Sequence, residues 1–216
     1  MRIIDLTHTI NPDIPLFPGT DAPAFSSIAT QESNGFSETR IVLTSHTGTH
    51  MDAPSHILTD GLSLDQFPAS QFIGSAVVVD CSDVKDGRSI SMDYVMKRSP
   101  QIEEAEFVLF RTGWEQLWHT KEYLGHYPIL DDSVISYLIK RPIKGIGLDT
   151  MSPDALADSA LEHHKALLGN NCVIIENLTN LSLLGSGLFT FIALPLKYNC
   201  SDGSPVRAVA CFPDDD

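Results

Sequence analysis

Frequent glycine and proline residues restrict this chain to short helices and short strands. The 216 residues include 14 Gly and 13 Pro, and both residue types tend to end regular elements. Short apolar runs at residues 76–80 and 106–111 are typical of buried strands, and residues 132–140 have the apolar spacing of a helix. Strands and helices are mixed, without a clean βαβ alternation. We therefore predict an α/β fold, a single domain over residues 1–216 with a mixed, curved or barrel-like sheet and flanking helices.

Other local patterns predict the remaining elements. Ser159 and Glu162 match a capping box, so we expect a helix that begins with Ser159 as its N-cap, carries His163 and His164 and stops at Gly169. Further strands are expected at residues 3–7, 38–45, 145–149, 172–176, 189–194 and 206–212, and a further helix at residues 91–98.

Charge and cysteine usage exclude several classes of partner. Acidic residues outnumber basic ones by 28 to 14, which gives a formal net charge of −14 and disfavours nucleic acid and anionic membranes. The sequence has no apolar run near the ~20 residues of a membrane-spanning helix. Its four cysteines are scattered and no N-terminal apolar segment follows a basic stretch, so we expect neither a disulfide scaffold nor a secretory route. The expected location is the cytoplasm.

The most informative segment contains His46, His50, Asp52 and His56. All four positions are even, so in an extended chain their side chains share one face. A straight strand would separate His46 from His50 by about 13 Å at ~3.3 Å per residue, whereas two imidazoles on one metal need nitrogens within about 4 Å. The backbone must therefore bend, and Gly48 permits the bend. The mixed nitrogen and oxygen donors suit zinc, manganese or iron(II) in a catalytic site; the alternative is a polar strand with surface histidines.

A second group of polar residues lies downstream. His163 and His164 sit on the expected helix, and at least one of them should face away from any site. Glu176 ends the apolar run 173–175, and a buried carboxylate must be paired or bound to a metal. The alternative is that Glu176 has emerged into solvent at the end of its strand.

Residues 46–56 read H-T-G-T-H-M-D-A-P-S-H and match the signature H-x-G-T-H-x-D-x-P-x-H. The sequence thereby resembles the cyclase family of metal-dependent hydrolases, which includes bacterial kynurenine formamidase, an arylformamidase of tryptophan catabolism, and isatin hydrolase. The resemblance extends over most of the chain, through weaker matches at residues 5–8, 111–114, 147–150, 164–169, 193–197 and 202–207.

The resemblance implies a swivelling β/β/α fold and two bound divalent metal ions. We expect zinc as the metal, with manganese as the alternative. It assigns the site residues as follows: His46, His50 and Asp52 to the first ion, Asp52 and Glu176 as bridges to a second ion held also by His164, and His56 as the general acid/base. His164 is preferred to His163 because it begins the matched segment H-K-A-L-L-G.

The chemistry follows from such a site. Divalent metals lower the pKa of a bound water toward ~7, and a histidine with a pKa near ~6.5 can pass a proton to a leaving nitrogen. We expect a hydrolase of an amide-type C–N bond in a small molecule, with a metal-activated water and His56 as general acid/base.

N-formylkynurenine, an aryl formamide, is the leading substrate. The alternatives are a cyclic, isatin-like amide or another small amide, and a non-catalytic metal- or ligand-binding protein. A serine or cysteine hydrolase is disfavoured because the sequence lacks a G-x-S-x-G elbow.

The segment before the signature bears on substrate and assembly. Where the formamidases have Trp in a W-P-G segment, this sequence has Phe17, which we expect to line the substrate pocket. Met151 lies in a loop where members of the family that this sequence resembles commonly have a smaller residue or proline. The proline-rich segment 11–23 should form an extended loop that does not pack easily within one small domain. Together with the resemblance, this loop predicts a homodimer or homotetramer.

Overall fold

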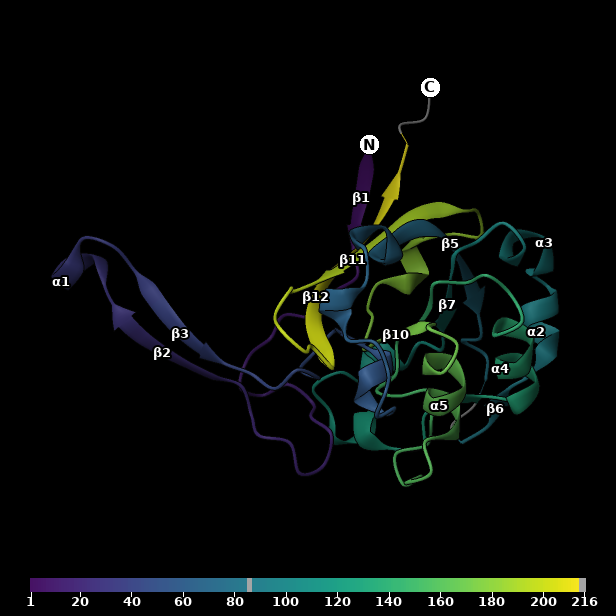
Figure 1. Cartoon of the computed structure of the whole chain (residues 1–216), viewed down its shortest axis with the longest axis horizontal. Coiled ribbons are helices and arrows are strands. Elements are labelled where there is room, and N and C mark those ends of the chain that lie inside the picture. The colour runs from purple at the N-terminus through teal and green to yellow at the C-terminus, as the bar shows by residue number, and fades with distance from the viewer. Residues whose placement is uncertain (85–86, 214–216) are drawn as a thin grey trace.

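The computed structural model describes residues 1–84 and 87–213, and its main feature is a closed barrel of seven strands (Figure 1). The barrel closes because the long last strand pairs with two other strands of the barrel, one of which is the strand of the histidine signature. A further strand, β1 (Arg2–Asp5), adds to the outside of β12. In order around the barrel, the strands are β12 (Gly203–Phe212), β11 (Phe189–Pro195), β5 (Ile73–Asp80), β7 (Phe107–Arg111), β9 (Gly145–Leu148), β10 (Val173–Glu176) and β4 (His50–Asp52). The predicted mixed, barrel-like sheet is confirmed.

One half of the barrel is parallel. Strands β5, β7, β9 and β10 run in the same direction. The segments between them contain α2 (Met92–Met96), α3 (Ser99–Ile102), α4 (Asp132–Leu138) and α5 (Glu162–Leu168). A βαβ run is therefore present, and the expectation of no clean alternation was wrong for this part. These helices have only four to seven residues, so their periodic signal in the sequence is weak.

The strand residues alternate between two cores. Ala76 and Val78 of β5 point into the barrel, where they pack with Phe107 and Phe191. Val77 lies on the other side of the same strand, in the core shared with the helices. This alternation is the period of two that a sheet buried on both faces requires.

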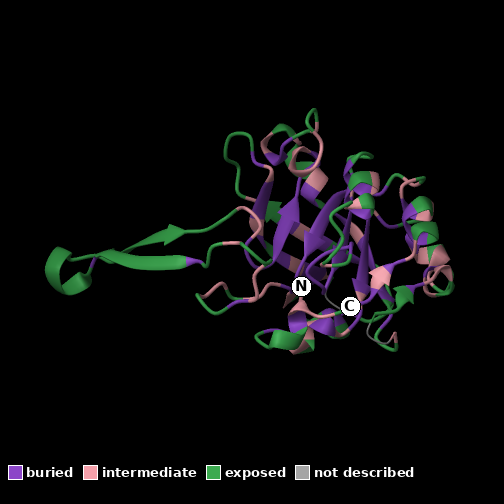
Figure 2. Ribbon diagram, turned by 90° about the horizontal axis from the view of Figure 1, so that it is seen from below, coloured by how far each residue is buried: buried purple, intermediate pink, exposed green. Residues whose placement is uncertain are grey.

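An arm projects from the barrel (Figures 1 and 2). It is a ribbon of β2 (Ala24–Ala29) and β3 (Glu38–Val42) with α1 (Gln31–Asn34) at its tip, and it forms a sheet separate from the barrel. The expected strand at residues 38–45 exists as far as Val42, but it belongs to this arm and not to the main sheet.

The proline-rich segment 11–23 does pack on its own chain, contrary to expectation. Ile14 is buried in a cluster with Trp114, Trp118 and Met151. The remaining elements are short: β6 (Ser89–Ile90), β8 (Ile129–Leu130) and the 3-10 helices η1 (Pro54–His56), η2 (Leu64–Gln66), η3 (Ala69–Phe72), η4 (Trp114–Leu117), η5 (Lys121–Leu124) and η6 (Leu181–Leu183). Within residues 1–84 and 87–213, every helix falls short of the length and apolar character that a membrane crossing needs.

Candidate metal centre

The backbone bend expected in the histidine signature is present at Gly48. This residue has φ = 66°, in the left-handed region that glycine adopts without strain. The turn brings the ring centroids of His46 and His50 to 5.1 Å, far closer than a straight strand allows. His50 and Asp52 then form the two ends of β4, and His50 is in register with Glu176 of β10. Two segments remote in sequence thus meet at one edge of the barrel.

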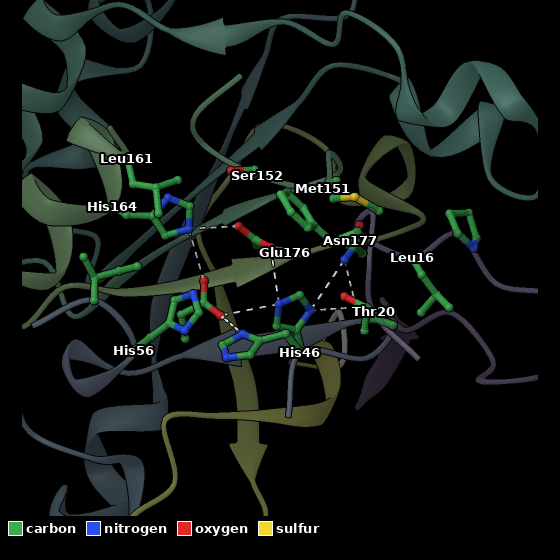
Figure 3. Close-up of a pocket in the computed structure, with 16 residues that line it drawn as sticks. Leu16, Thr20, His46, His56, Met151, Ser152, Leu161, His164, Glu176 and Asn177 are labelled. Carbon is green, nitrogen blue, oxygen red and sulfur yellow. Dashed lines mark hydrogen bonds and ion pairs between the residues drawn. The ribbon is translucent and has the colours of Figure 1, made fainter. Parts of the chain in front are cut away.

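The first cluster of potential metal ligands contains His46, His50 and Asp52 (Figure 3). His46 Nδ1 lies 2.7 Å from Asp52 Oδ1. His50 Nε2 lies 3.4 Å from the same oxygen and 3.3 Å from Glu176 Oε2. The side chains of His50 and Asp52 are almost completely buried, whereas the His46 side chain is 23% exposed.

The second cluster contains Asp52, His164 and Glu176. His164 Nε2 lies 3.6 Å from Asp52 Oδ2 and 3.5 Å from Glu176 Oε1. Asp52 therefore belongs to both clusters. Glu176 is 5% exposed, which excludes the alternative that it emerges into solvent. His163 faces away from the cluster, because its ring nitrogens contact the Pro153 carbonyl oxygen and the Asp132 carboxylate.

The electrostatics of the two clusters suit cations. Asp52 Oδ2 and Glu176 Oε1 are buried and have no hydrogen-bond partner in the part of the chain that the structure describes, an arrangement that is costly unless a positive charge compensates it. Burial lowers the pKa of His50, but Asp52 and Glu176 outweigh this effect and raise that pKa to about 10. Burial likewise opposes a charge on His164, yet Asp154, Asp52 and Glu176 raise its pKa to about 12. The residues present therefore fit divalent metal ions bound through nitrogen and oxygen.

Asp154 orients His164, and no local pattern in the sequence indicates this role. His164 Nδ1 lies 2.6 Å from Asp154 Oδ2, the carboxylate–histidine arrangement that fixes metal-binding imidazoles. The same carboxylate accepts hydrogen bonds from the backbone N–H groups of His163 and His164, at 2.9 and 3.0 Å. The expected capping box at Ser159 was wrong: α5 begins at Glu162, its N-cap Leu161 makes no side-chain cap, and Asp154 takes that role from outside the helix.

His46 and His50 also contact polar groups outside the two clusters. His46 Nε2 lies 3.2 Å from Asp202 Oδ2, just before β12. A Cβ atom at Gly203 would lie 2.5 Å from His46 Cε1, so only glycine leaves room for this ring. His50 Nδ1 donates to the Gly48 carbonyl oxygen at 2.8 Å.

Asn177 binds the same carbonyl oxygen of the turn at Gly48. Its Nδ2 donates to the Gly48 carbonyl oxygen at 2.8 Å, and its Oδ1 accepts from the Tyr123 hydroxyl at 2.7 Å. Its position directly after Glu176 was the only signal in the sequence that could have indicated it.

A cavity of about 330 Å³ opens over the clusters, within the usual range for small-molecule pockets. His56 lies at its edge, with its ring centroid 4.0 Å from that of His46. Burial lowers the pKa of His56, and His46 and His164 act in the same direction against the opposing effect of Asp52. Phe17, which is 51% exposed, and Met151 contribute to the apolar wall. The structure thus brings all seven predicted site residues to one cavity.

Comparison with known proteins gives matches along nearly the whole chain. The Cyclase family model, described as "Putative cyclase", matches residues 4–155. The kynurenine formamidase of Erythrobacter litoralis is 32% identical over 209 residues, which cover 96% of this chain and 93% of the relative. Isatin hydrolase A from Labrenzia aggregata, solved with benzyl benzoate, has a TM-score of 0.87 at 31% identity and covers 97% of this chain and 93% of its own. A solved structure described as a potential metal-dependent hydrolase with cyclase activity has a TM-score of 0.80 at 26% identity, covering 97% of this chain and 96% of that one.

Proposed function

The chain belongs to the cyclase family of metal-dependent hydrolases, and from this premise we propose that it hydrolyses an amide-type C–N bond in a small molecule, an aryl formamide such as N-formylkynurenine first of all. The observation that carries the proposal is the pair of buried carboxylates, Asp52 and Glu176, each with an oxygen that lacks a hydrogen-bond donor in the described chain. Both face histidines inside a substrate-sized cavity. We place this chemistry in a single domain spanning residues 1–216.

The two clusters support two divalent ions per chain, zinc first and manganese second. His46, His50 and Asp52 would hold one ion; Asp52 and Glu176 would reach a second, with His164 as its imidazole ligand. Such ions, when bound, polarise a carbonyl oxygen and lower the pKa of a water. The imidazole and carboxylate donors suit both metals.

His56 moves the proton. Since its pKa is lowered by burial, the ring is neutral at neutral pH, so one of its nitrogens can accept a proton from the attacking water. The water oxygen bonds to the carbonyl carbon, the C–N bond breaks, and His56 returns the proton to the leaving nitrogen. The products of an aryl formamide are formate and an aryl amine, and no other reactant is needed.

Phe17 and Met151 shape substrate choice. Phe17 offers an aromatic face to an aryl ring, which contributes on the order of 1 kcal/mol beyond its buried area. The formamidases have Trp at this place. Phe17 lacks the indole N–H of that residue, so a hydrogen bond from this donor to the substrate is absent. The likeness to isatin hydrolase A supports a cyclic amide as a second candidate, because ring opening of such a substrate uses the same proton transfers.

The test is an amide-hydrolysis assay on zinc- or manganese-loaded protein, with N-formylkynurenine, isatin and an aliphatic formamide in parallel. We expect hydrolysis of the aryl formamide that is lost on dialysis against a chelator and restored by metal. Hydrolysis of isatin alone would show that the substrate is a cyclic amide and not N-formylkynurenine, and the protein would still be a hydrolase of amide-type C–N bonds. A loaded protein that cleaves none of the three would favour a metal- or ligand-binding protein on this scaffold.

We also propose a cytoplasmic location, supported by four cysteines that are all free in the structure, three of them buried, as thiols remain in reducing compartments. Immunodetection in fractionated cells tests this location. The acidic composition disfavours nucleic acid and anionic membranes as partners, and the cavity over the clusters supports a small-molecule substrate.

A further inference from the structure

Asn177 lines the cavity and is hydrogen-bonded through its backbone and through both ends of its side chain (Figure 3). Its backbone N–H donates to the Thr150 carbonyl oxygen at 3.0 Å, and its carbonyl oxygen accepts from the Thr49 hydroxyl at 2.6 Å. Its side-chain amide lies between the Tyr123 hydroxyl and the Gly48 carbonyl oxygen. The backbone has φ = 58°, a left-handed conformation that asparagine adopts more readily than most side chains. These contacts fix the amide in one place.

The Gly48 carbonyl oxygen connects this amide to a metal ligand. It accepts two hydrogen bonds, from His50 Nδ1 and from Asn177 Nδ2, each at 2.8 Å. Because Nδ1 of the imidazole carries this proton, its Nε2 is the nitrogen that can bind a metal. Nε2 lies 3.4 Å from Asp52 Oδ1 and 3.3 Å from Glu176 Oε2. The position of the Gly48 carbonyl group therefore sets the direction in which His50 presents Nε2.

Tyr123 fixes the other end of the amide. Its side chain is completely buried, and its ring packs edge-on against Trp118 with the ring centroids 4.9 Å apart. Burial raises the pKa of Tyr123 well above its usual value, so the hydroxyl keeps the proton that it donates to Asn177 Oδ1. Without this donor, Oδ1 would be a buried acceptor with a lost partner, which is costly. The amide would then have reason to turn away from Gly48.

We propose that Asn177 is a positioning residue for His50 and that Tyr123 acts through it. The tyrosine hydroxyl fixes the asparagine amide, the amide fixes the Gly48 carbonyl oxygen, and this oxygen orients the imidazole so that Nε2 faces the first cluster. The proposal rests on the proposed function, because it requires that His50 bind an ion. It extends the surroundings of that ion to η5, which carries Tyr123.

A double-mutant cycle on zinc affinity tests this connection without any assay of activity. Tyr123→Phe removes only the hydroxyl, and Asn177→Gly removes the side chain while glycine keeps the left-handed backbone without strain. We expect each variant to lose about 10-fold in affinity for one zinc ion, the lower end of the range for a lost outer partner. Since both changes break the same connection, the double variant should also lose about 10-fold, whereas independent effects would multiply to about 100-fold.

The matched control is Tyr127→Phe. Tyr127 is also a buried tyrosine of the same apolar cluster, but its hydroxyl donates to the Asp154 carbonyl oxygen at 2.9 Å and not to Asn177. Whatever its own effect on zinc affinity, this effect should be the same in the wild type and in Asn177→Gly. Only the tyrosine that bonds to Asn177 should show coupling.

Cobalt(II) in place of zinc provides a spectroscopic signature, because its visible absorption bands depend on the positions of its ligands. Tyr123→Phe and Asn177→Gly should change these bands in the same way. Multiplying losses in the cycle, or a Tyr123→Phe variant with the affinity and spectrum of the wild type, would overturn the proposal. A wild type that binds neither metal would instead contradict the proposed function itself. If circular dichroism shows that Tyr123→Phe is unfolded, the affinity and spectrum of Asn177→Gly alone decide, and values equal to those of the wild type refute the positioning role.

Discussion

Replacing Asp154 by asparagine should weaken metal binding without emptying the site. Asp154 Oδ2 lies 2.6 Å from His164 Nδ1, and the Asp154 carboxylate accepts hydrogen bonds from two backbone N–H groups of α5. Asparagine keeps the shape and one acceptor oxygen, but it loses the negative charge and turns an NH₂ group toward these donors. Loss of such an outer partner typically costs 10–100-fold in metal affinity, or about 1.4–2.7 kcal/mol.

The matched control is Asp132→Asn. Asp132 makes the equivalent carboxylate contact, at 2.9 Å, with the neighbouring His163, which faces away from the clusters. The assay is a competition titration of zinc between each protein and a chelating dye at neutral pH. We expect the Asp154 variant to release one zinc at a lower dye concentration, while the Asp132 variant follows the wild type. Equal affinity for the Asp154 variant and the wild type, or equal losses in both variants, would refute the assignment of His164 as the ligand.

Four further outcomes are expected. Purified protein should contain about two zinc or manganese ions per chain by elemental analysis, and chelation should lower its Tm, because metals bound only to the folded state stabilise it. His56→Ala should keep the metal and lose about 10²–10⁴-fold in kcat/KM for an amide substrate, whereas Asp52→Ala should lose the metal as well. Phe17→Trp should raise kcat/KM for an aryl formamide by about five-fold, because the indole N–H adds a hydrogen bond that contributes about 1 kcal/mol; unchanged or lower values would show that no such bond is gained. Burial and His119 lower the pKa of His8 from 6.5 to about 4, so the unfolded chain binds a proton in this interval before the folded protein does. Stability should therefore fall as the pH drops from 6.5 toward 4, and thermal melts of His8→Phe should show a smaller fall.

The signature residues could be predicted because their information is local. The even spacing of His46, His50 and Asp52 requires one face, and the distance between the histidines requires the bend that Gly48 makes. Asp154 and Asp202 could not be predicted in this way. Asp154 is ten residues from His164, and Asp202 is 156 residues from His46, so only the folded barrel shows that they touch.

The fold shows the same division between local and distant information. Strands such as β7 and β10 were predictable because apolar runs reveal burial. Their order around the barrel was not, since it depends on pairing between distant segments. Residues 38–42 were correctly predicted as a strand, but their place in the projecting arm was not predicted. Alternation of polar and apolar residues is the same in a projecting ribbon and in a strand at the edge of a sheet. At α5, the match to a capping box gave the wrong start, because a carboxylate from another loop satisfies the same N–H groups.

Barrel closure sets the order in which the metal centre can form during synthesis. Gly203 pairs with Asp52 and Pro205 with His50, about 150 residues apart along the chain, and the backbone at Gly203 bounds the space for the His46 ring. The signature segment therefore leaves the ribosome long before the strand that completes its surroundings. Contacts between such distant segments form slowly, because the loop between them must be closed first. Tight metal uptake thus belongs after residues 203–205 have left the ribosome and paired with β4, and a nascent chain stalled before residue 203 would expose the histidines and the unpaired edge of β4.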